Sequence, residues 1–536
     1  MIVSTSVTGN LAVIITEELL KAARAAFDKL LKKSKGSKNM EKVVSAAVMR
    51  ESDAYTVKNV TDAKTLMLRA GRGIFESFDF FGKVAVVCGE GNNAGDGYVL
   101  ALLLKEKNID VTVFLVGERF STDGRYYFEK CVERGIKYEK CDDETDFSKF
   151  DIIADCIFGT GFHGETSPAI SRIIDKINES GKFVVSADIN SGLDSDSGFF
   201  SKCVRSSLTV SVGTYKYGHF LGSAKDVIKT KKNIDIGIDI CGDFALLVEK
   251  DDVLPLLSHR KNNSNKGNYG YVGIMGGCTE YSGAVKLSNL ALSALRAGAG
   301  VSRLIIPESI TESVSPYILE STLMPLCDRD GHIVFDKEKI DASLFRLASL
   351  AVGMGWGESE ENGKILSYIL ENYSIPLLID ADGLNTLSKL DKEILKHTKC
   401  SVVLTPHPKE FERLCGVPVK EILSSPVGYA KRFTEEYGVI LLLKGASTVI
   451  CGKDGTYIVD RGCPGMASAG SGDVLSGILA GMLGYTECSA LAVACGAYIA
   501  GIAGEMAQKE YTDIAMTSSD TVKMIPKAVK YIRGEE

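Results

Sequence analysis

A short glycine-rich segment near the end of the chain, AGSGDVLSG, joins an acidic side chain to a turn that suits an anion. Its small residues, Ala469 to Gly472, let a ligand approach the backbone closely. The apolar run that follows predicts a helix, whose first N–H groups point at negative charge. Asp473 stands at that helix start, where it could take a proton from a hydroxyl that exchanges a phosphoryl group. Asp is also a good helix cap, and taken alone the segment supports both readings equally.

Two more polar segments in this half follow predicted strands. LLLKGASTVI places Lys444 and small hydroxyl residues after one strand, and LTPHPKEF places His407, Lys409 and Glu410 after another. Because α/β folds build their sites where strands end, we expect these groups to converge with Asp473 around a nucleotide. The chain contains no Gly-Lys-Ser or Gly-Lys-Thr, so this is not a Walker loop.

The first half of the chain has its own glycine turn, GEGNNAGDG, from Gly89 to Gly97. It looks like a dinucleotide fingerprint in which Glu118 would be the ribose acid, but Gly95 comes one position late. The two asparagines and the aspartate of this turn also disfavour that interpretation, since dinucleotide turns carry almost no side chains. The turn therefore predicts a polar ligand site of another kind.

Acidic and hydroxyl residues follow two later strands of the first half. DCIFGTGFHGE begins with Asp155, and SADINSGLDSDSG contains Asp188 and Ser191. With Asn93, the residues Asp155 and Ser191 supply hard oxygen ligands that suit a group 1 or group 2 cation. Each of them alone is explained as well by turn formation.

The elements that must position these residues alternate between strand and helix from Met40 onward. Short β-branched runs such as KVAVVC, VTVFLV and FVVSADI are separated by amphipathic stretches, which is typical of parallel sheets with helices on both faces. Apolar density drops between Val248 and Gly270. The sequence thus predicts an α/β fold with a Rossmann-like three-layer α/β/α domain over residues 40–248 and a second α/β domain over 249–536.

The composition matches a soluble globular enzyme of two or more domains, with 45% hydrophobic and 24% charged residues in 536. A net charge of −7 without charge runs argues against nucleic acid as a partner. No apolar run looks long enough to span a membrane. The fourteen scattered cysteines favour reduced thiols in the cytoplasm over disulfides or a zinc site.

Residues 1–39 stand apart from the rest of the chain. The stretch TEELLKAARAAFDKLLKK predicts an amphipathic helix, and SKGSKN predicts a polar tether after it. The extension is interpreted as a helix that docks on its own protein, as residues added by cloning, or as a tethered helix for a partner.

The motifs of the second half, including NKGNYGYVGIMGG, GMGWG, DADGLNTL, TPHPKEF, KGAST and MASAGSGDVLSG, together resemble the ribokinase-like NAD(P)H-hydrate dehydratases from about Asp252 onward. The resemblance implies ADP-driven removal of water from a hydrated nicotinamide cofactor, with Mg²⁺ bridging the phosphates. It implies that the hydrate is contacted by Ala284, Gly355, His407 and Asp473. It implies that the nucleotide is held by Lys444, Gly445, Ala446, Ser447, Thr448 and Gly472. Departures, such as Cys278 where the family has serine, are mild.

The motifs of the first half, with VVSAAVMRESDAYTVKN, LMLRAG and GTYKYGHFLGSAKD, are similar to the NAD(P)H-hydrate epimerase domain over about Met40 to Ile240. The resemblance implies contacts to the hydrate from Asn92, Asn93, Ala94, Gly95, Asp96, Gly159, Thr160, Gly161, Phe162, His163, Gly164, Glu165 and Asp188. Asp188 is the expected acid–base group, and Asn93, Asp155 and Ser191 are the expected K⁺ ligands. Asn190 departs from the family, which has proline there, and this puts the rigidity of the turn in question.

Together the two resemblances imply a bifunctional repair enzyme. One half would epimerise the R and S hydrates NADHX and NADPHX, and the other would dehydrate the S form with ADP, releasing AMP and phosphate. We also expect a cytoplasmic homo-oligomer that contacts neither nucleic acid nor membrane. The alternative is a ribokinase-type small-molecule kinase whose first half is a non-catalytic interaction module.

Overall fold

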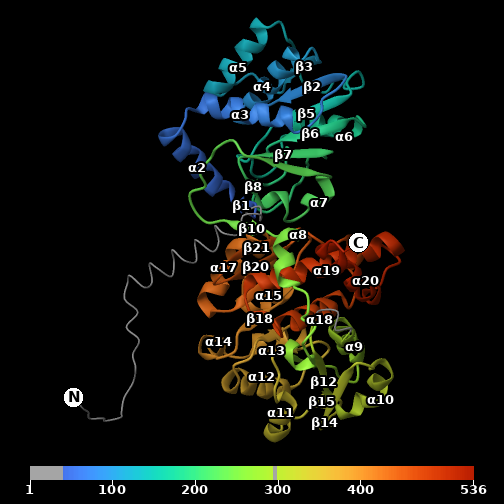
Figure 1. The fold of residues 1–536 in the computed structure, drawn as a ribbon. Helices are drawn as coiled ribbons and strands as arrows, with labels where there is room; N and C mark the ends of the chain where they lie inside the picture. The colour runs from blue at the N-terminus through green and yellow to red at the C-terminus, as the bar shows by residue number, and fades with distance from the viewer. Residues whose placement is uncertain (1–39, 294–297, 536) are drawn as a thin grey trace, which may run out of the picture. The chain divides into compact units, whose positions relative to one another are not determined.

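The computed structural model describes residues 40–293 and 298–535. The expected helix and tether of residues 1–39 lie outside these described residues. Figure 1 shows the order of the elements along the chain.

The first half is built on a parallel sheet of seven strands. Their order is β4 (Lys137–Lys140), β3 (Asp110–Leu115), β2 (Lys83–Cys88), β5 (Ile152–Cys156), β6 (Phe183–Ala187), β7 (Leu208–Val212) and β9 (Lys231–Ile234). Consecutive strands run outward in one direction from β2 and in the other direction from β5. The neighbours β2 and β5 therefore flank the point where the strand order reverses, which is where open α/β sheets bind ligands.

Helices cover both faces of this sheet (Figure 1). In β2, Val84, Val86 and Cys88 share a buried cluster with one set of helices, while Ala85 and Val87 share another with α6. The helices of this half are α2 (Ala46–Asn59), α3 (Ala63–Glu76), α4 (Asn92–Glu106), α5 (Thr122–Glu133), α6 (Pro168–Glu179) and α7 (Ala224–Val227). Because α3, α4 and α5 lie opposite α6, the half has three α/β/α layers, as the sequence predicted.

The second half forms the larger part of a twelve-stranded sheet. Its order begins with the parallel strands β13 (Ser321–Leu326), β12 (Val301–Pro307), β11 (Tyr271–Met275), β16 (Ser349–Val352), β17 (Leu377–Ile379), β18 (Val402–Leu404) and β19 (Ile440–Leu443). It continues with the antiparallel strands β20 (Thr448–Gly452) and β21 (Gly455–Val459). A separate hairpin joins β14 (Asp328–Arg329) to β15 (His332–Ile333).

Two groups of helices sandwich this second sheet. One face carries α8 (Lys250–Val253), α9 (Ser282–Ser293), α10 (Thr311–Val314), α18 (Ser471–Leu483), α19 (Ala490–Tyr511) and α20 (Ser518–Arg533). The other carries α11 (Lys337–Leu344), α12 (Glu360–Asn372), α13 (Asp382–Lys389), α14 (Ile394–His397), α15 (Pro408–Cys415), α16 (Val419–Ser424) and α17 (Pro426–Tyr437). Leu442 of β19 faces the first group and Leu441 and Leu443 face the second, which is the strand alternation expected of a sheet buried on both sides.

Three short strands continue the second sheet beyond β21. They are β10 (Ala245–Leu247), β1 (Lys42–Val44) and β8 (Tyr215–Lys216). Leu246 pairs with Tyr457 in parallel, and Val43 pairs with both Ala245 and Tyr215. The backbone of the first half therefore completes the sheet of the second.

Helix α19 corrects one expectation from the sequence. Its 22 residues have a mean hydropathy of 1.6 over their most apolar window, so the chain does contain an apolar run long enough to cross a membrane. Of that window, 83% is buried within the protein. Ala494, Tyr498 and Ile502 belong to the core cluster beneath the second sheet, so α19 is apolar on all sides because it is a core helix.

Two candidate active sites

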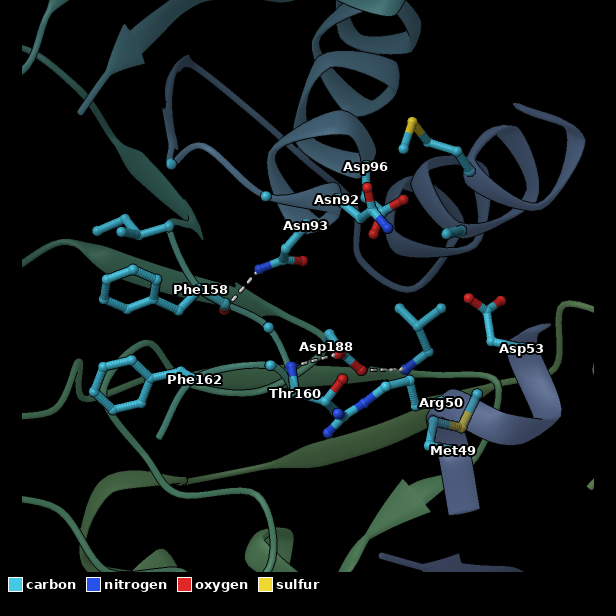
Figure 2. A pocket seen from close by; sticks show the side chains of 18 of the residues that line it. Met49, Arg50, Asp53, Asn92, Asn93, Asp96, Phe158, Thr160, Phe162 and Asp188 are labelled. Carbon is cyan, nitrogen blue, oxygen red and sulfur yellow. Dashed lines mark hydrogen bonds between the residues drawn. The ribbon is translucent and has the colours of Figure 1, made fainter. Parts of the chain in front are cut away.

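The first candidate site is a cavity of about 880 Å³ at the carboxyl ends of β2, β5 and β6 (Figure 2). The loops that follow these strands form one wall, and α2 and α3 form another. Of the residues expected to contact a ligand here, the cavity is lined by Asn92, Asn93, Asp96, Gly159, Thr160, Gly161, Phe162, His163 and Asp188. Ala94, Gly95, Gly164 and Glu165 are not among the lining residues. Ala94 belongs instead to the core beneath α4.

Asp188 is held in this cavity by an unusual backbone and by a buried lysine. Its φ of 64° is rare for a residue with a side chain, so the surrounding contacts must fix it. Nζ of Lys216 lies 2.5 Å from Oδ1 of Asp188, and the lysine side chain is only 1% exposed. The N–H of Thr160 donates to Oδ2 over 3.2 Å. The carboxylate is therefore oriented by groups from two other segments.

His219 supports the same residue from behind. Its Nδ1 accepts the backbone N–H of Lys216 over 2.9 Å, so Nε2 carries the proton and donates to the carbonyl of Asp188 over 2.8 Å. Burial and the charge of Lys216 lower the pKa of His219 to about 4, so this ring is neutral. Burial works against ionisation of Asp188, but Lys216 outweighs it and holds the pKa of that carboxyl below its usual value.

Two of the other carboxyl groups that line the cavity have shifted pKa values. Asp96 lies near the start of α4 and Asp53 lies on α2 (Figure 2). Burial, together with the negative charge of Asp188 and Asp53, raises the pKa of Asp96 well above its usual value. Burial and Asp188 likewise raise the pKa of Asp53, with Lys216 acting in the opposite sense. The three carboxyl groups thus have different affinities for a proton within one cavity.

The expected cation ligands Asn93, Asp155 and Ser191 come together beside this cavity. The Ser191 hydroxyl lies 2.5 Å from Oδ1 of Asp155, and the Ser191 N–H donates to Oδ2 over 2.9 Å. The Nδ2 of Asn93 donates to the Phe158 carbonyl over 2.8 Å. The Oδ1 of Asn93 is buried and accepts no hydrogen bond from the described residues.

This oxygen cluster fits a monovalent cation. Asp155 is fully buried, and no cationic side chain of the described residues forms a salt bridge with it. A buried carboxylate without a counter-ion is costly, and an orphaned amide oxygen adds to that cost. A cation such as K⁺ would relieve both, because K⁺ takes carboxylate, amide and hydroxyl oxygens.

The turn at Asn190 is rigid although it lacks the proline of the resembling family. The Asn190 side chain is fully buried, and its Nδ2 donates to the carbonyls of Val204 and Val227 over 2.8 and 3.2 Å. Its Oδ1 accepts hydrogen bonds from the hydroxyls of Ser206 and Thr209. Side-chain hydrogen bonds therefore fix the turn that carries Asp188 and Ser191.

Sequence reasoning missed several residues of this first site. Lys216, Arg50, Asp53 and Met49 all line the cavity but were not expected there. Lys216 is the second residue of a two-residue strand, and Arg50 and Asp53 lie within the first helix of the described chain. The motifs that resemble the epimerase domain include these segments, but the spacing of the residues does not predict a role for them in the site.

The second candidate site surrounds the start of α18. Gly470 precedes the helix with a φ of 92°, a left-handed conformation that glycine adopts without strain, and Asp473 is the third helical residue. The Asp473 side chain makes no capping hydrogen bond among the described residues. The structure therefore does not support the interpretation of Asp473 as a helix cap.

A buried ion pair lies next to Asp473. Nζ of Lys444 is 2.6 Å from Oδ1 of Asp380, and the Ser476 hydroxyl donates to Oδ2 over 2.6 Å. A Cβ placed on Gly472 would lie 3.4 Å from the Lys444 ammonium, so the lysine faces the glycine turn. Burial and the Asp380 carboxylate raise the pKa of Asp473 to about 7, with Lys444 acting in the opposite sense. Asp473 is thus poised to exchange a proton near neutral pH.

His407 begins α15 and acts as its N-cap. Its Nδ1 accepts the backbone N–H groups of Lys409 and Glu410 over 3.1 and 3.3 Å, and its Nε2 lies 3.4 Å from Oε1 of Glu410 on a half-exposed ring. Burial and the charges of Lys444 and Arg413 lower the pKa of His407. The ring is therefore a neutral hydrogen-bonding group near Lys444 and Asp380.

Ala284 and Gly355 lie beside one another. Gly355 has a φ of 61°, and a Cβ on it would lie 3.0 Å from the Ala284 Cβ and 2.4 Å from the Tyr281 carbonyl. A larger side chain at Gly355 would therefore collide with the segment that carries Ala284.

The expected nucleotide loop from Lys444 to Thr448 connects β19 to β20. Ser447 in this loop is buried and donates to Oδ1 of Asp460 over 2.7 Å, while Gly445 and Ala446 are exposed. Asp460 is paired with Lys231 over 2.6 Å. Gly445 and Ala446 of the loop are therefore accessible, while the Ser447 hydroxyl anchors the loop inside the protein.

Asp380 and Asp382 were not expected as site residues. Both stand in the DADG motif directly after β17, which could have marked them, because polar residues at a strand end point to a ligand site. Oδ2 of Asp382 accepts the Gly357 N–H over 2.8 Å and so holds the loop after β16.

Comparisons with known proteins cover both halves of the chain. Residues 272–527 match the family described as NAD(P)H-hydrate dehydratase, and residues 63–218 match the YjeF-related protein N-terminus. A bifunctional NAD(P)H-hydrate repair enzyme from Moorella thermoacetica is 32% identical over 92% of this chain and 97% of its own length. One from Thermofilum pendens is 34% identical over 84% of this chain and 88% of its own.

Among solved structures, an ADP/ATP-dependent NAD(P)H-hydrate dehydratase from Bacillus subtilis, co-crystallised with ATP and Mg²⁺, is 28% identical. The match covers 53% of this chain and 97% of the chain in that structure, with a TM-score of 0.47.

The fold and the two sites define a fused α/β enzyme with a Rossmann-like half and a ribokinase-like half. The chain belongs to the family of bifunctional NAD(P)H-hydrate repair enzymes. The comparisons favour this repair function over the alternative of a small-molecule kinase with a non-catalytic first half.

Proposed function

We propose that the first site epimerises the R and S hydrates of NADH and NADPH, and that the second dehydrates the S form with ADP. The observation that carries this proposal is an acid beside a lysine at each site: Asp188 is ion-paired with Lys216, and Asp473 lies near Lys444, which is ion-paired with Asp380. Asp188 follows β6 of the seven-stranded sheet, whereas Lys444 and Asp380 follow β19 and β17 of the twelve-stranded sheet, so one chain carries two separate centres for proton transfer.

In the second site, Asp473 takes the proton from the hydroxyl of the hydrate as its oxygen attacks the β-phosphoryl group of ADP. AMP leaves, and the phosphorylated oxygen then departs as phosphate while the neighbouring ring carbon loses a proton. The ring double bond is restored. Lys444 and the first N–H groups of α18 bind the phosphates, and the loop Gly445 to Thr448 holds the rest of the nucleotide.

The nucleotide brings Mg²⁺ with it. Asp380 is already paired with Lys444 and hydrogen-bonded to Ser476, so the ion would be held chiefly by the phosphates. It would neutralise charge that develops on the transferred phosphoryl group. Ala284, Gly355 and His407 would then position the nicotinamide ring of the hydrate.

In the first site, Asp188 exchanges protons with the oxygen that leaves or joins the ring carbon whose configuration is inverted. K⁺ would be held by Asn93, Asp155 and Ser191, where it would supply a fixed positive charge for an oxygen of the hydrate. Asp188 keeps its charge because Lys216 compensates the cost of its burial.

The experiment that tests this proposal follows the recovery of reduced-nicotinamide absorbance from a mixed-epimer NADH hydrate. The assay contains Mg²⁺ and K⁺ with ADP, ATP or no nucleotide. Full recovery with ADP is expected, since the R form must be epimerised before it is dehydrated. Recovery that stops near half, at the level set by spontaneous epimerisation, would contradict the first activity. No recovery with either nucleotide would contradict the second.

Two variants separate the activities. Asp188→Ala is expected to abolish epimerisation and to leave dehydration of the S hydrate intact, because Asp188 follows a strand of the seven-stranded sheet, whereas Asp473 lies in α18, which packs on the twelve-stranded sheet. Asp473→Ala is expected to do the reverse. Equal loss of both activities in either variant would contradict the division of labour.

The state of the cysteines bears on where in the cell the protein is located. A cytoplasmic location is supported by the fourteen cysteines, all of which are free. A homo-oligomer stays a prediction that sedimentation of the purified chain would test.

A further inference from the structure

Three of the carboxyl groups that line the epimerase cavity come from three different elements. Figure 2 shows Asp53 on α2, Asp96 on α4 and Asp188 after β6, with their carboxyl groups facing the same space. Of these three aspartates, only Asp188 forms a salt bridge with a described residue, Lys216. The sites of Asp53 and Asp96 therefore lack the cation that keeps Asp188 ionised.

This arrangement distributes protons unequally. Asp188 has a pKa below its usual value because of Lys216, and Asp96 has one well above it because it is buried near Asp188 and Asp53. Two carboxyl groups whose environments favour opposite protonation states provide an acid and a base in one site. The environment of Asp188 thus favours its carboxylate form, and the environment of Asp96 favours its protonated form.

The chemistry of the substrate calls for such a pair. The hydroxyl of the hydrate stands on a carbon bonded to the ring nitrogen. Its configuration is inverted if the hydroxyl leaves from one face of the ring and water adds to the other. Departure needs an acid on the first face, and addition needs a base on the second.

We propose that Asp96 is the second acid–base residue of the epimerase site and acts on the face of the ring opposite to Asp188. This inference rests on the proposed function of the first site. Asp96 gives its proton to the hydroxyl, which leaves as water while the nitrogen lone pair forms a C=N⁺ bond. Water then attacks the other face, and Asp188 takes the proton that it releases. The pair shares one proton, which moves in the opposite sense in the reverse reaction, and exchange with solvent resets it.

The other charged groups of the cavity are consistent with these roles. The cavity is also lined by Arg50 on α2, by Lys216 in β8, and by the acids Asp53, Glu90 and Asp123. Arg50 forms no salt bridge with Asp96 within the described residues, so it does not force that group to ionise. Asp53 adds negative charge near Asp96 and favours its protonated form.

The test measures interconversion of purified R and S NADH hydrate by the full chain with K⁺ and without nucleotide, above the spontaneous rate. Asp96→Asn keeps the shape of the side chain but cannot give up a proton. We expect kcat to fall at least 100-fold with KM changed less than threefold. Glu106→Gln, an exposed change at the other end of α4, is the matched control and should leave both constants unchanged. ADP-driven dehydration of the S hydrate by the same variant reports that the chain is folded.

Two further readouts separate catalysis from a structural role. In H₂¹⁸O each epimerisation should place one ¹⁸O on the ring, because the original hydroxyl departs. The wild-type kcat should fall at both low and high pH, and Asp96→Asn should lose this two-sided profile together with its rate.

Outcomes that overturn the inference are distinct from failure of the proposed function. Epimerisation by Asp96→Asn at the wild-type rate, a rise in KM alone, or retention of the original oxygen would each refute the role of Asp96. A wild-type chain that does not accelerate epimerisation would instead refute the proposed function of the site.

Discussion

Lys444 and Ser476 bind opposite oxygens of one buried carboxylate, that of Asp380, each over 2.6 Å. Lys444 follows β19, Asp380 follows β17 and Ser476 lies in α18, so this carboxylate joins three elements at one point. Because Asp473 lies three residues before Ser476, the same contact fixes the proposed base relative to the proposed phosphate ligand. The main effect of this ion pair is to fix the positions of the side chains, since a buried ion pair adds little net stability to the fold.

Replacing Asp380 should weaken nucleotide binding. Asp380→Asn leaves Lys444 without its anchor, and we expect the Kd for ADP, measured by calorimetry, to rise about tenfold, or about 1.4 kcal/mol. Ser476→Ala removes a single hydrogen bond to the same carboxylate and is the matched control, with an expected change of less than threefold. Similar effects of both variants would argue against an anchoring role for Asp380.

Asp473→Asn should separate activity from stability. We expect kcat for dehydration to fall about 1000-fold or more, since the variant cannot accept a proton. The pKa of Asp473 is raised to about 7 in the folded state. Between about pH 4 and pH 7 this residue therefore ionises only in the unfolded chain, so the wild type loses stability as the pH rises through that range. The variant should therefore be more stable at pH 8, by about 2 kcal/mol in chemical unfolding. A less stable variant would contradict this assignment.

The pH dependence of dehydration should report the same residue. Asp473 must be ionised to act as a base, so kcat/KM should decline below a midpoint near pH 7. A rate that stays constant down to pH 5 would mean that another group takes the proton.

Lys216 should act through Asp188. Lys216→Met removes the charge that keeps Asp188 ionised, so epimerisation should fall at least tenfold and its acidic limb should move to higher pH. Lys216→Arg keeps the charge and should restore part of the rate. A loss of rate without any shift in the pH profile would indicate that Lys216 supports the fold only.

The oxygen cluster should make the first half respond to K⁺. Addition of K⁺ in place of a bulky organic cation should raise the melting temperature and the rate of epimerisation, since binding to the folded state stabilises it. Asn93→Leu, which removes the orphaned Oδ1, should abolish the K⁺-dependent shift in melting temperature. A shift of the same size in this variant would place the cation elsewhere.

Much of the architecture is predictable from the sequence for a physical reason. Buried parallel strands such as KVAVVC read as continuous apolar runs, and polar residues directly after them mark the sheet edge where ligands bind. Asp155, Asp188, His407 and Lys444 were found in this way.

Other site residues have no local signature. Lys216 reaches Asp188 only because β7, the turn at Gly213 and β8 fold back toward the end of β6. A lysine is most often exposed, so its burial at 1% cannot be inferred from its neighbours. Asn190 is a second example. Its buried side-chain hydrogen bonds hold the turn in place of a proline, and the sequence pattern around it does not predict these bonds.

The pairing of Leu246 with Tyr457 has a consequence for how such a chain can be divided. Strand β10 lies just before the expected boundary at residue 248, yet it covers the edge of β21. A gene split at that boundary would give a dehydratase with a bare strand, and exposed edges of this kind recruit other chains. A dehydratase half made on its own would therefore have to protect the edge of β21 by another device.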